Sequence, residues 1–441
     1  MANNEFRNRL QKEACDELFR SGRVIVNWAT GAGKSRVAVN AIDRLLDKNK
    51  TRILLLVTES VHKANWRKEF IDVLGDFLGA STFAGITVEC YASLPKYAYS
   101  EWDLIIADEA HHLRSDNRCE ILSTMSSEMV LCLSATINEN GDADTLMESL
   151  TSTFGQFKTF DFSLQDAIDT GVLSPPRIIV HILKMEDMGV REFVFERGFK
   201  NARKSILINN DTLVERVLLN PMKYPHLSAT VRLPMRKAYD AIDRLFAIAK
   251  NDYLSYCRYV DTMSEEGDVP SDCLKRKQFY LSAWLRVGLL RKNFLASCKT
   301  EYASQLLRSF GRRKYICFCN DVPQGIAIGG EDIVYSKRSA KENDAIITRF
   351  NNGETNSLFA VGMLKEGANL AGIELGLIIQ LDGKERPFIQ KFGRAMRSSS
   401  PEQHIIVFKG CQDRQYFKKA FENMNMDYVQ YRFPQGSKFN P

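Results

Sequence analysis

The chain has 441 residues, 44% of them hydrophobic, and a formal net charge of +6, which is too small to indicate a partner by itself. This length suits two or three domains with well-filled cores. No apolar run approaches the ~20 residues of a membrane helix, and the first residues lack the apolar core of a signal peptide. We therefore expect a cytoplasmic protein with no membrane partner.

Residues 1–175 alternate short β-branched runs with amphipathic stretches, beginning with RVIVNW at 23–28 and a helical pattern from Lys34. This alternation predicts a parallel sheet with crossover helices. A double proline and a further strand-like run, LSPPRIIVHILKM at 173–185, complete the region. We therefore expect the first domain to span residues 1–185.

A glycine-rich loop, NWATGAGKS at 27–35, joins the first strand to the helical pattern that follows it. In such loops, backbone N–H groups and the helix N-terminus bind phosphate oxygens. Lys34 would reach the outer phosphates and the Ser35 hydroxyl would bind Mg²⁺. The residues expected to bind the nucleotide phosphates are Thr30, Gly31, Ala32, Gly33, Lys34 and Ser35.

An apolar strand within DLIIADEAHH, residues 103–112, ends in two carboxylates, Asp108 and Glu109. In open α/β sheets, phosphate sites form at the C-terminal edge of the strands. Asp108 could hold Mg²⁺ through water, and Glu109 could orient and deprotonate an attacking water. The alternative is that the pair only supplies negative charge to a helix N-terminus.

Residues 190–310 lack this alternation and contain two long helical patterns, at 235–260 and 274–310. We expect a mostly helical insertion at 186–295. Residues 271–314 carry eleven Lys or Arg and two Asp or Glu, a local net charge of +9.

This basic stripe indicates a track for a polyanion, with Lys275, Arg276 and Lys277 as its first contacts. The opposite side of the helix would pack on the last domain through Phe279, Trp284 and Phe294. The alternative is a solvated helix face, or charges paired with the acidic loop at 264–268.

The α/β alternation returns from Lys314, and we expect the last domain at 296–441. Within FIQKFGRAMRSS, at 388–399, a helix would place Gln390, Arg394 and Arg397 on one face, because they are spaced i, i+4, i+7. Two arginines presented by a second lobe suit the stabilisation of charge on a transferring phosphoryl group. A surface salt-bridge face is the alternative.

In this order, these elements resemble the superfamily 2 helicases and translocases, a resemblance that covers nearly all of the chain apart from the middle of the insertion. It is also carried by RNRLQKEA (7–14), VTESVHKANWRKEF (57–70), ECYASLPK (89–96), SAT (134–136), ICFCND (316–321) and FAVGMLKEGANL (359–370). The resemblance implies an α/β fold with two RecA-like parallel-sheet lobes and an ATP hydrolase that moves on nucleic acid.

The resemblance also implies roles for individual residues. Gln11 would read adenine, and His111 would hydrogen-bond Gln390. Asn369, where the family usually has Asp, would contact the nucleotide without a charge. The Ser134, Ala135 and Thr136 turn would couple lobe closure to hydrolysis. The implied nucleic-acid contacts are Thr58, Tyr91, Asn320, Gly362 and Lys365.

Within the family, GAGKS, DEAHH and the insertion look most like the DNA-directed group, which includes phage UvsW-type branch-migration helicases and restriction-system motor subunits. This implies an ATP- and Mg²⁺-dependent DNA helicase or translocase of a phage or bacterium, acting on forked or branched DNA in recombination or replication. The alternatives are an RNA helicase, a motor subunit of a restriction-type complex, and an ATP-gated nucleic-acid clamp. The sequence indicates no particular protein partner.

Overall fold

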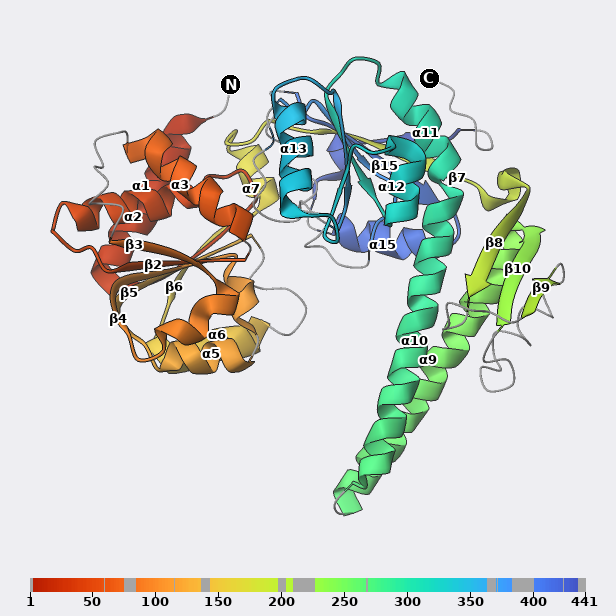
Figure 1. The fold of residues 1–441 in the computed structure, drawn as a ribbon, viewed down its shortest axis with the longest axis horizontal. Helices are drawn as coiled ribbons and strands as arrows, with labels where there is room; N and C mark the ends of the chain where they lie inside the picture. Colours follow the sequence, from red (N-terminus) through yellow and green to blue (C-terminus); the bar gives the residue numbers. More distant parts are fainter. Residues whose placement is uncertain are drawn as a thin grey trace.

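The computed structural model describes residues 3–58, 60–74, 85–114, 116–135, 143–196, 204–208, 227–266, 269–362, 370, 372–382, 400–422 and 424–434. Two parallel sheets, of six and seven strands, confirm the expected α/β class with two lobes (Figure 1). None of the described helices combines the length and the apolar character that a membrane span requires.

Lobe one contains a sheet with the strand order β3-β2-β4-β5-β1-β6. Its strands are β1 (Arg23–Trp28), β2 (Ile53–Val57), β3 (Ile86–Cys90), β4 (Glu101–Asp108), β5 (Ser126–Ser134) and β6 (Lys158–Phe162). Its helices are α1 (Asn4–Ser21), α2 (Lys34–Leu46), α3 (Ser60–Leu74), η1 (Tyr91–Tyr97), η2 (Ala110–Arg114), α5 (Asp116–Ser123), α6 (Ala143–Phe154) and α7 (Leu164–Asp169). All five residues of β2 are buried, as expected of a parallel strand covered by helices on both faces.

Lobe two contains a sheet with the strand order β12-β13-β11-β14-β15-β7-β16. Its strands are β7 (Arg177–Leu183), β11 (Tyr315–Cys319), β12 (Ile333–Tyr335), β13 (Ser357–Val361), β14 (Leu375–Ile378), β15 (Glu402–Phe408) and β16 (Val429–Arg432). The helical segments η3 (Met185–Met188), α11 (Thr300–Ser309), α12 (Val322–Gly329), α13 (Ala340–Asn351), α15 (Gln412–Ala420) and η4 (Met426–Tyr428) lie between or beside them.

Strand β7 lies in the sheet of lobe two, although the sequence predicts a first domain that extends to residue 185. It pairs in parallel with β15 and β16, so residues 177–183 complete the sheet of lobe two and not that of lobe one. The apolar pattern of this segment predicts a strand correctly. It does not specify the sheet, because the pairing partner lies more than 200 residues away in the chain.

The insertion contains a small sheet as well as helices. Strands β8 (Val190–Glu196), β9 (Lys204–Ile208) and β10 (Leu227–Pro234) pair in the order β8-β10-β9. Helices α9 (Met235–Glu266) and α10 (Ser271–Cys298) then run side by side away from lobe two, and we call this pair the arm (Figure 1).

The packing of α10 differs from the expectation for a single helix over 274–310. The helix ends at Cys298, and α11 begins at Thr300. Trp284 packs on Phe246 and Tyr253 of α9, with ring centroids 6.2 and 5.4 Å apart. The prediction that Trp284 and Phe279 hold the helix to lobe two is therefore wrong, since Phe279 is also 51% exposed. Phe294 alone of the three is buried in a core shared with lobe two.

Candidate active site

The strand register of lobe one brings three sequence motifs to one edge of the sheet. Asp108 at the end of β4 is opposite Leu133 of β5, and Ser134 is opposite Asn27 of β1. Neighbouring strands lie about 4.8 Å apart, so the ends of β4 and β1 are separated by about 10 Å. The phosphate loop, which follows Trp28, and the Asp-Glu pair therefore meet at the C-terminal edge.

The loop after β1 has the conformation that its glycines allow. Gly31 and Gly33 have φ of 90° and 96°, in the left-handed region that side chains disfavour. A Cβ at Gly33 would also lie 2.4 Å from Nε2 of Gln11. Helix α2 begins at Lys34, and the Lys34 ammonium donates to the Trp28 carbonyl at 2.8 Å. Backbone and ammonium therefore form a tight cradle of the kind that fits a phosphate chain.

Gln11, which lies in α1 upstream of the phosphate loop, contacts this loop. Its side chain is 4% exposed, and Nε2 donates to the Gly33 carbonyl at 3.1 Å. The side chain of Arg7 also reaches the loop, with Cδ 3.4 Å from the position of a Cβ at Gly33. Arg9 instead forms an exposed pair with Glu13, so of these two arginines Arg7 is the one that lies against the loop.

Three neighbours fix the orientation of Asp108. Its Oδ2 accepts from the Trp66 indole at 2.8 Å, and its Oδ1 accepts from the Glu109 backbone N–H at 3.1 Å. The Tyr91 hydroxyl donates to the Asp108 carbonyl at 2.8 Å. The role of Trp66 is not predicted from the sequence. The only signal is its place within the segment 57–70, which the family resemblance assigns to nucleic acid.

The expectation that Tyr91 contacts nucleic acid is wrong, because its side chain is 2% exposed. Its ring stacks on His112, with centroids 6.0 Å apart, and the Arg118 guanidinium lies over the Tyr91 ring, 5.5 Å from its centroid. Burial, followed by the nearby Asp108 carboxylate, holds the pKa of Tyr91 well above its ordinary value. Tyr91 is therefore a neutral donor that supports the strand end.

Glu109 has a strained backbone and a carboxylate held near the next motif. Its φ is 51°, which is uncommon for a residue with a side chain and is often found at functional sites. Its Oε2 lies 3.5 Å from Nδ1 of His111. That same nitrogen lies 3.4 Å from the Ser134 hydroxyl, and His111 is 4% exposed. The Asp-Glu-x-His segment is thus linked directly to the end of β5, where Ala135 follows.

Ser35 and Asp108 fit the requirements of Mg²⁺ beside a nucleotide. Among the described residues, no three His, Cys, Asp or Glu side chains form a metal-binding group. Mg²⁺ at phosphate sites is commonly bound by one or two protein oxygens, with waters and phosphate oxygens completing the shell. One hydroxyl at the start of α2 and one carboxylate at the end of β4 supply such a set.

Three of the expected nucleic-acid contacts follow strand ends. Thr58 follows β2, Asn320 follows β11, and Gly362 follows β13 with φ of 65°. The Thr58 hydroxyl lies 2.6 Å from Nδ1 of His62. The Asn320 amide donates to Oδ1 of Asn293 in the arm at 2.9 Å.

Several other expected site residues lie outside the described part of the chain. They are Thr136, Lys365, Asn369, Gln390, Arg394 and Arg397. Their roles in coupling, strand contact and hydrolysis remain predictions.

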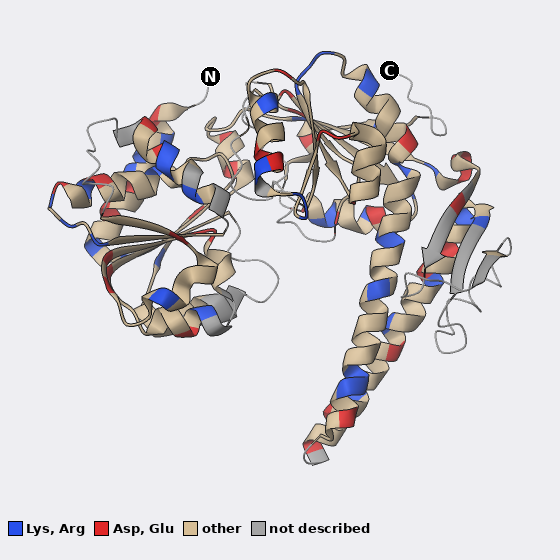
Figure 2. Ribbon diagram, in the orientation of Figure 1, with Lys and Arg blue, Asp and Glu red and all other residues tan. Residues whose placement is uncertain are grey.

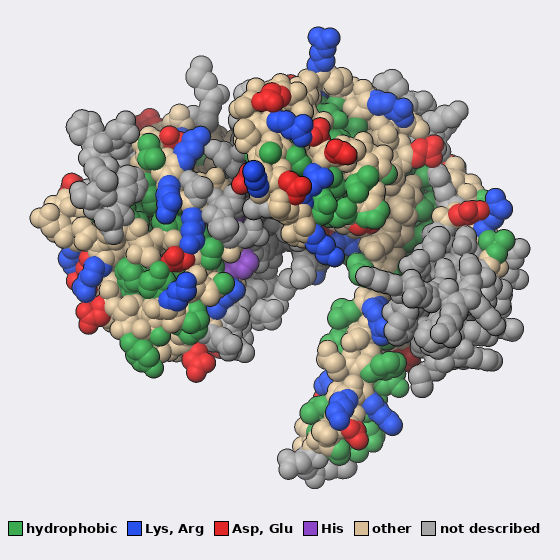
Figure 3. Space-filling model, in the orientation of Figure 1, with side chains coloured by type: hydrophobic (Ala, Val, Ile, Leu, Met, Phe, Trp, Pro, Cys, Tyr) green, Lys and Arg blue, Asp and Glu red, His purple; other side chains and the backbone are tan. Residues whose placement is uncertain are grey.

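The basic residues Lys275, Arg276 and Lys277 lie at the far end of the arm, near the connection between α9 and α10 (Figure 2). Lys275 pairs with Asp272 at 3.1 Å, and Lys277 pairs with Asp261 of α9 at 3.7 Å. Figure 3 shows cationic and hydrophobic side chains interspersed along the arm. The described pairs of Lys275 and Lys277 are thus with Asp272 and Asp261, whereas the acidic loop at 264–268 lies partly outside the described residues.

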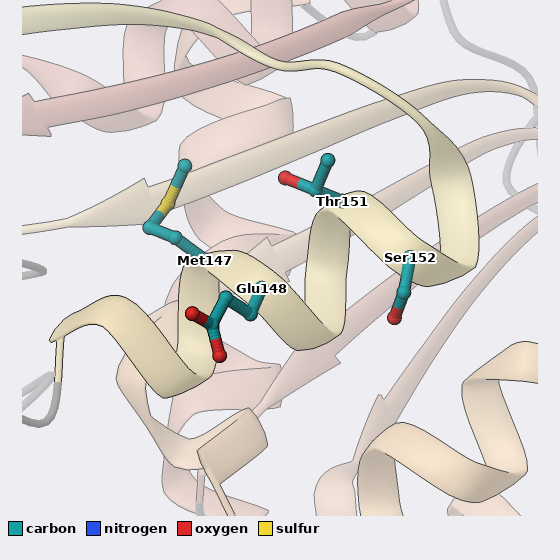
Figure 4. A pocket seen from close by; sticks show the side chains of 4 residues that line it. All are labelled: Met147, Glu148, Thr151 and Ser152. Carbon is teal, nitrogen blue, oxygen red and sulfur yellow. The ribbon is translucent and has the colours of Figure 1, made fainter.

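A surface pocket on α6 does not coincide with the candidate site. It is lined by Met147, Glu148, Thr151 and Ser152 (Figure 4). None of these residues belongs to a motif identified in the sequence.

Two family models match the chain. Residues 5–139 match "Type III restriction enzyme, res subunit", and residues 299–399 match "Helicase conserved C-terminal domain". The DNA 3'-5' translocase XPB2 of Sulfurisphaera tokodaii is 23% identical to this chain, covering 93% of it and 84% of that protein. The crystal structure of the Pyrococcus furiosus Hef helicase domain aligns at a TM-score of 0.47 and 14% identity, over 93% of this chain and 96% of that chain. The two models cover, in order, the phosphate loop with the Asp-Glu pair and the segment with the paired arginines.

Proposed function

The chain belongs to the superfamily 2 helicases and translocases and is an ATP-hydrolysing nucleic-acid motor, and we propose that its substrate is DNA. The observation that carries the chemistry is the register of β4, β5 and β1, which places Asp108, Ser134 and the phosphate loop at one edge. The relative named as a DNA 3'-5' translocase supports DNA and suggests the same direction of movement here.

In lobe one, we assign each part of the reaction to a residue of the edge. The loop 30–35 binds phosphates through its N–H groups and the Lys34 ammonium. Ser35 and Asp108 would hold Mg²⁺, and this ion would neutralise negative charge on the phosphoryl group that ATP supplies. Glu109 accepts a proton from the attacking water at its carboxylate. Gln11 holds the loop through the Gly33 carbonyl and would read the adenine base of the nucleotide.

In lobe two, Gln390, Arg394 and Arg397 complete the site across the cleft, with Asn369 as a neutral contact. Arginines supplied in this way stabilise the charge on the transferring group. Hydrolysis then depends on closure of the lobes, which couples ATP to movement. His111, Ser134, Ala135 and Thr136 relay that closure.

The nucleic-acid strand is contacted chiefly at its phosphates, by Thr58, Asn320, Gly362 and Lys365. Binding is therefore tolerant of sequence and sensitive to salt. The arm adds Lys275, Arg276 and Lys277 at its far end, where they suit the duplex part of forked or branched DNA.

A second candidate is a motor subunit that works within a restriction-type complex. It is favoured by the match of residues 5–139 to a restriction-enzyme subunit model. A chain of this kind would hydrolyse ATP on DNA but displace no strand until its partner is added.

The experiment is ATP hydrolysis by the purified chain with single-stranded DNA, duplex DNA, forked DNA and RNA of matched sequence. Strand displacement on a fork with either polarity is measured in parallel. We expect the strongest stimulation by forked DNA and 3'-5' movement. If RNA alone stimulates ATP hydrolysis, the substrate is RNA and not DNA. ATP hydrolysis on DNA without strand displacement would favour the motor-subunit alternative.

A further inference from the structure

A buried polar cluster lies where the arm enters lobe two. Lys299 separates α10 from α11, and its side chain is completely buried. Its ammonium pairs with Oδ2 of Asp413 at 2.6 Å and donates to Oε1 of Gln380 at 2.8 Å. We call Lys299, Gln380 and Asp413 the buried triad.

The triad forms a closed set of hydrogen bonds. Nε2 of Gln380 donates to Oδ1 of Asp413 at 2.7 Å. The backbone N–H of Phe408 donates to Oδ2 of Asp413 at 2.9 Å, and the Lys299 ammonium lies 5.6 Å from the Phe408 ring. The Gln380 amide therefore contacts both charged groups, and its position is fixed by both.

Stability alone does not account for this arrangement. Burying two ions costs several kcal/mol each, and apolar replacements of a buried pair are often as stable. What the pair adds is orientation: the ammonium donates to Oε1 of Gln380 and the carboxylate accepts from its Nε2, so the amide fits in one orientation only.

Gln380 lies just after β14, on the part of the chain that continues towards the predicted arginines. Gln380 lies two residues beyond β14, and Lys292 of α10 is 3.8 Å from Asp382, two residues further on. The sequence then continues through 383–399, which contains Arg394 and Arg397.

The same part of the arm holds a second strand end. Nε2 of Gln324 donates to the Ala296 carbonyl at 2.7 Å, and the Asn320 amide donates to Asn293. The last turns of α10 thus contact the chain after β11 as well as the chain after β14.

We propose that Gln380, held by Lys299 and Asp413, is a positioning residue for ATP hydrolysis. It fixes the path on which the chain leaves β14 up to Asp382, directly before the segment 383–399 that supplies the arginines proposed for hydrolysis. The inference rests on the proposed role of those arginines.

The test compares Gln380→Met with Tyr302→Phe in the full chain. Methionine keeps the length of Gln380 without its hydrogen bonds and leaves the Lys299–Asp413 pair in place. Tyr302→Phe also removes one buried hydrogen bond from lobe two, the one between the Tyr302 hydroxyl and His181 at 2.7 Å, in which no member of the triad takes part. Gln380→Asn, which keeps a buried amide but is too short to reach both ions, replaces the methionine variant if that variant does not fold.

Melting temperature, affinity for a fluorescent ATP analogue, and kcat and KM for ATP with saturating DNA are measured. We expect Gln380→Met to keep analogue affinity and KM within about twofold and to lose ~10-fold to 100-fold in kcat, as a misplacement of about 1 Å can cause. Tyr302→Phe should melt earlier and keep its kcat.

Parental kcat in Gln380→Met, or the same loss of kcat in both variants, would overturn the inference and leave the proposed function standing. A parent chain whose hydrolysis DNA does not stimulate would instead remove the proposed function, and the inference with it.

Discussion

The indole of Trp66 connects helix α3, which begins two residues after Thr58, with the Asp108 carboxylate proposed to hold Mg²⁺. Trp66 is 5% exposed on α3, and its N–H points to Oδ2 of Asp108. A hydrogen bond to a charged group contributes ~1.5–3 kcal/mol, enough to select one orientation of the carboxylate. A movement of α3 would therefore change the orientation of the Asp108 carboxylate.

Trp66→Phe should lower kcat/KM for ATP about tenfold, in line with the loss of one charge-assisted hydrogen bond. Steady-state hydrolysis with saturating DNA measures the effect. Trp102→Phe is the matched control, because the Trp102 indole donates to Ser100 at 2.7 Å near the opposite end of β4. Equal losses in both variants would show that the fold, and not the orientation of Asp108, is responsible.

At the scale of elements, a buried hydrogen-bonded chain joins β7, β15 and α11. The Tyr302 hydroxyl lies 2.7 Å from Nδ1 of His181, whose Nε2 lies 2.9 Å from Nδ1 of His404. Nε2 of His404 lies 3.0 Å from Glu402, a carboxylate that Arg177 and Arg313 also approach. The chain is consistent with two neutral imidazoles, each donating from Nε2, and it fixes β7 beside β15.

Lobe two should lose stability in mild acid because of this chain. Burial, with the nearby His404, lowers the pKa of His181 from its ordinary 6.5 to about 3. The unfolded chain therefore binds more protons than the folded chain between these values, so stability falls as pH drops from 6.5 towards 3. The slope contributed by one such group is up to ~1.4 kcal/mol per pH unit.

Urea unfolding of the parent and of His181→Asn between pH 8 and pH 5 tests this point. The variant should be less stable at pH 8, and its stability should depend less steeply on pH below 6.5. Parallel slopes for parent and variant would contradict the assignment of the acid sensitivity to His181.

The arm gives a second prediction at this scale. The pairs of Lys275 with Asp272 and of Lys277 with Asp261 are exposed, and exposed pairs contribute little to stability. Changing Lys275, Arg276 and Lys277 together to Ala should weaken DNA binding similarly for all sequences and reduce the salt slope by up to ~3 units. Hydrolysis without DNA should persist.

A salt titration of the binding of fluorescent forked DNA measures both quantities. Changing Arg414, Lys418 and Lys419 together to Ala, which removes three exposed cations of α15, serves as the control for net charge. An unchanged affinity and salt slope in the triple variant would leave the arm tip as a solvated surface.

At the scale of the whole molecule, local motifs could be predicted from the sequence and long-range placement could not. The phosphate loop and the Asp-Glu pair are found where expected because glycines and strand ends are encoded within a few residues. The assignment of β7 to lobe two depends on a partner strand more than 200 residues away in the chain, and the burial of Tyr91 depends on contacts with Asp108, His112 and Arg118 from other elements. The buried triad could not be predicted from the sequence either, since Lys299 is one of eleven cations within the basic segment 271–314.

We propose that ATP is hydrolysed at the C-terminal edge of the lobe-one sheet with Glu109 as the general base. The measurement is ATP hydrolysis by Glu109→Gln with saturating DNA, together with its affinity for a fluorescent ATP analogue. The amide keeps the size of Glu109 but cannot accept the proton of the water, so affinity should stay near the parental value while the rate falls by ~10²–10⁴. A variant that binds the analogue and hydrolyses ATP within about threefold of the parental rate would show that Glu109 is not the general base.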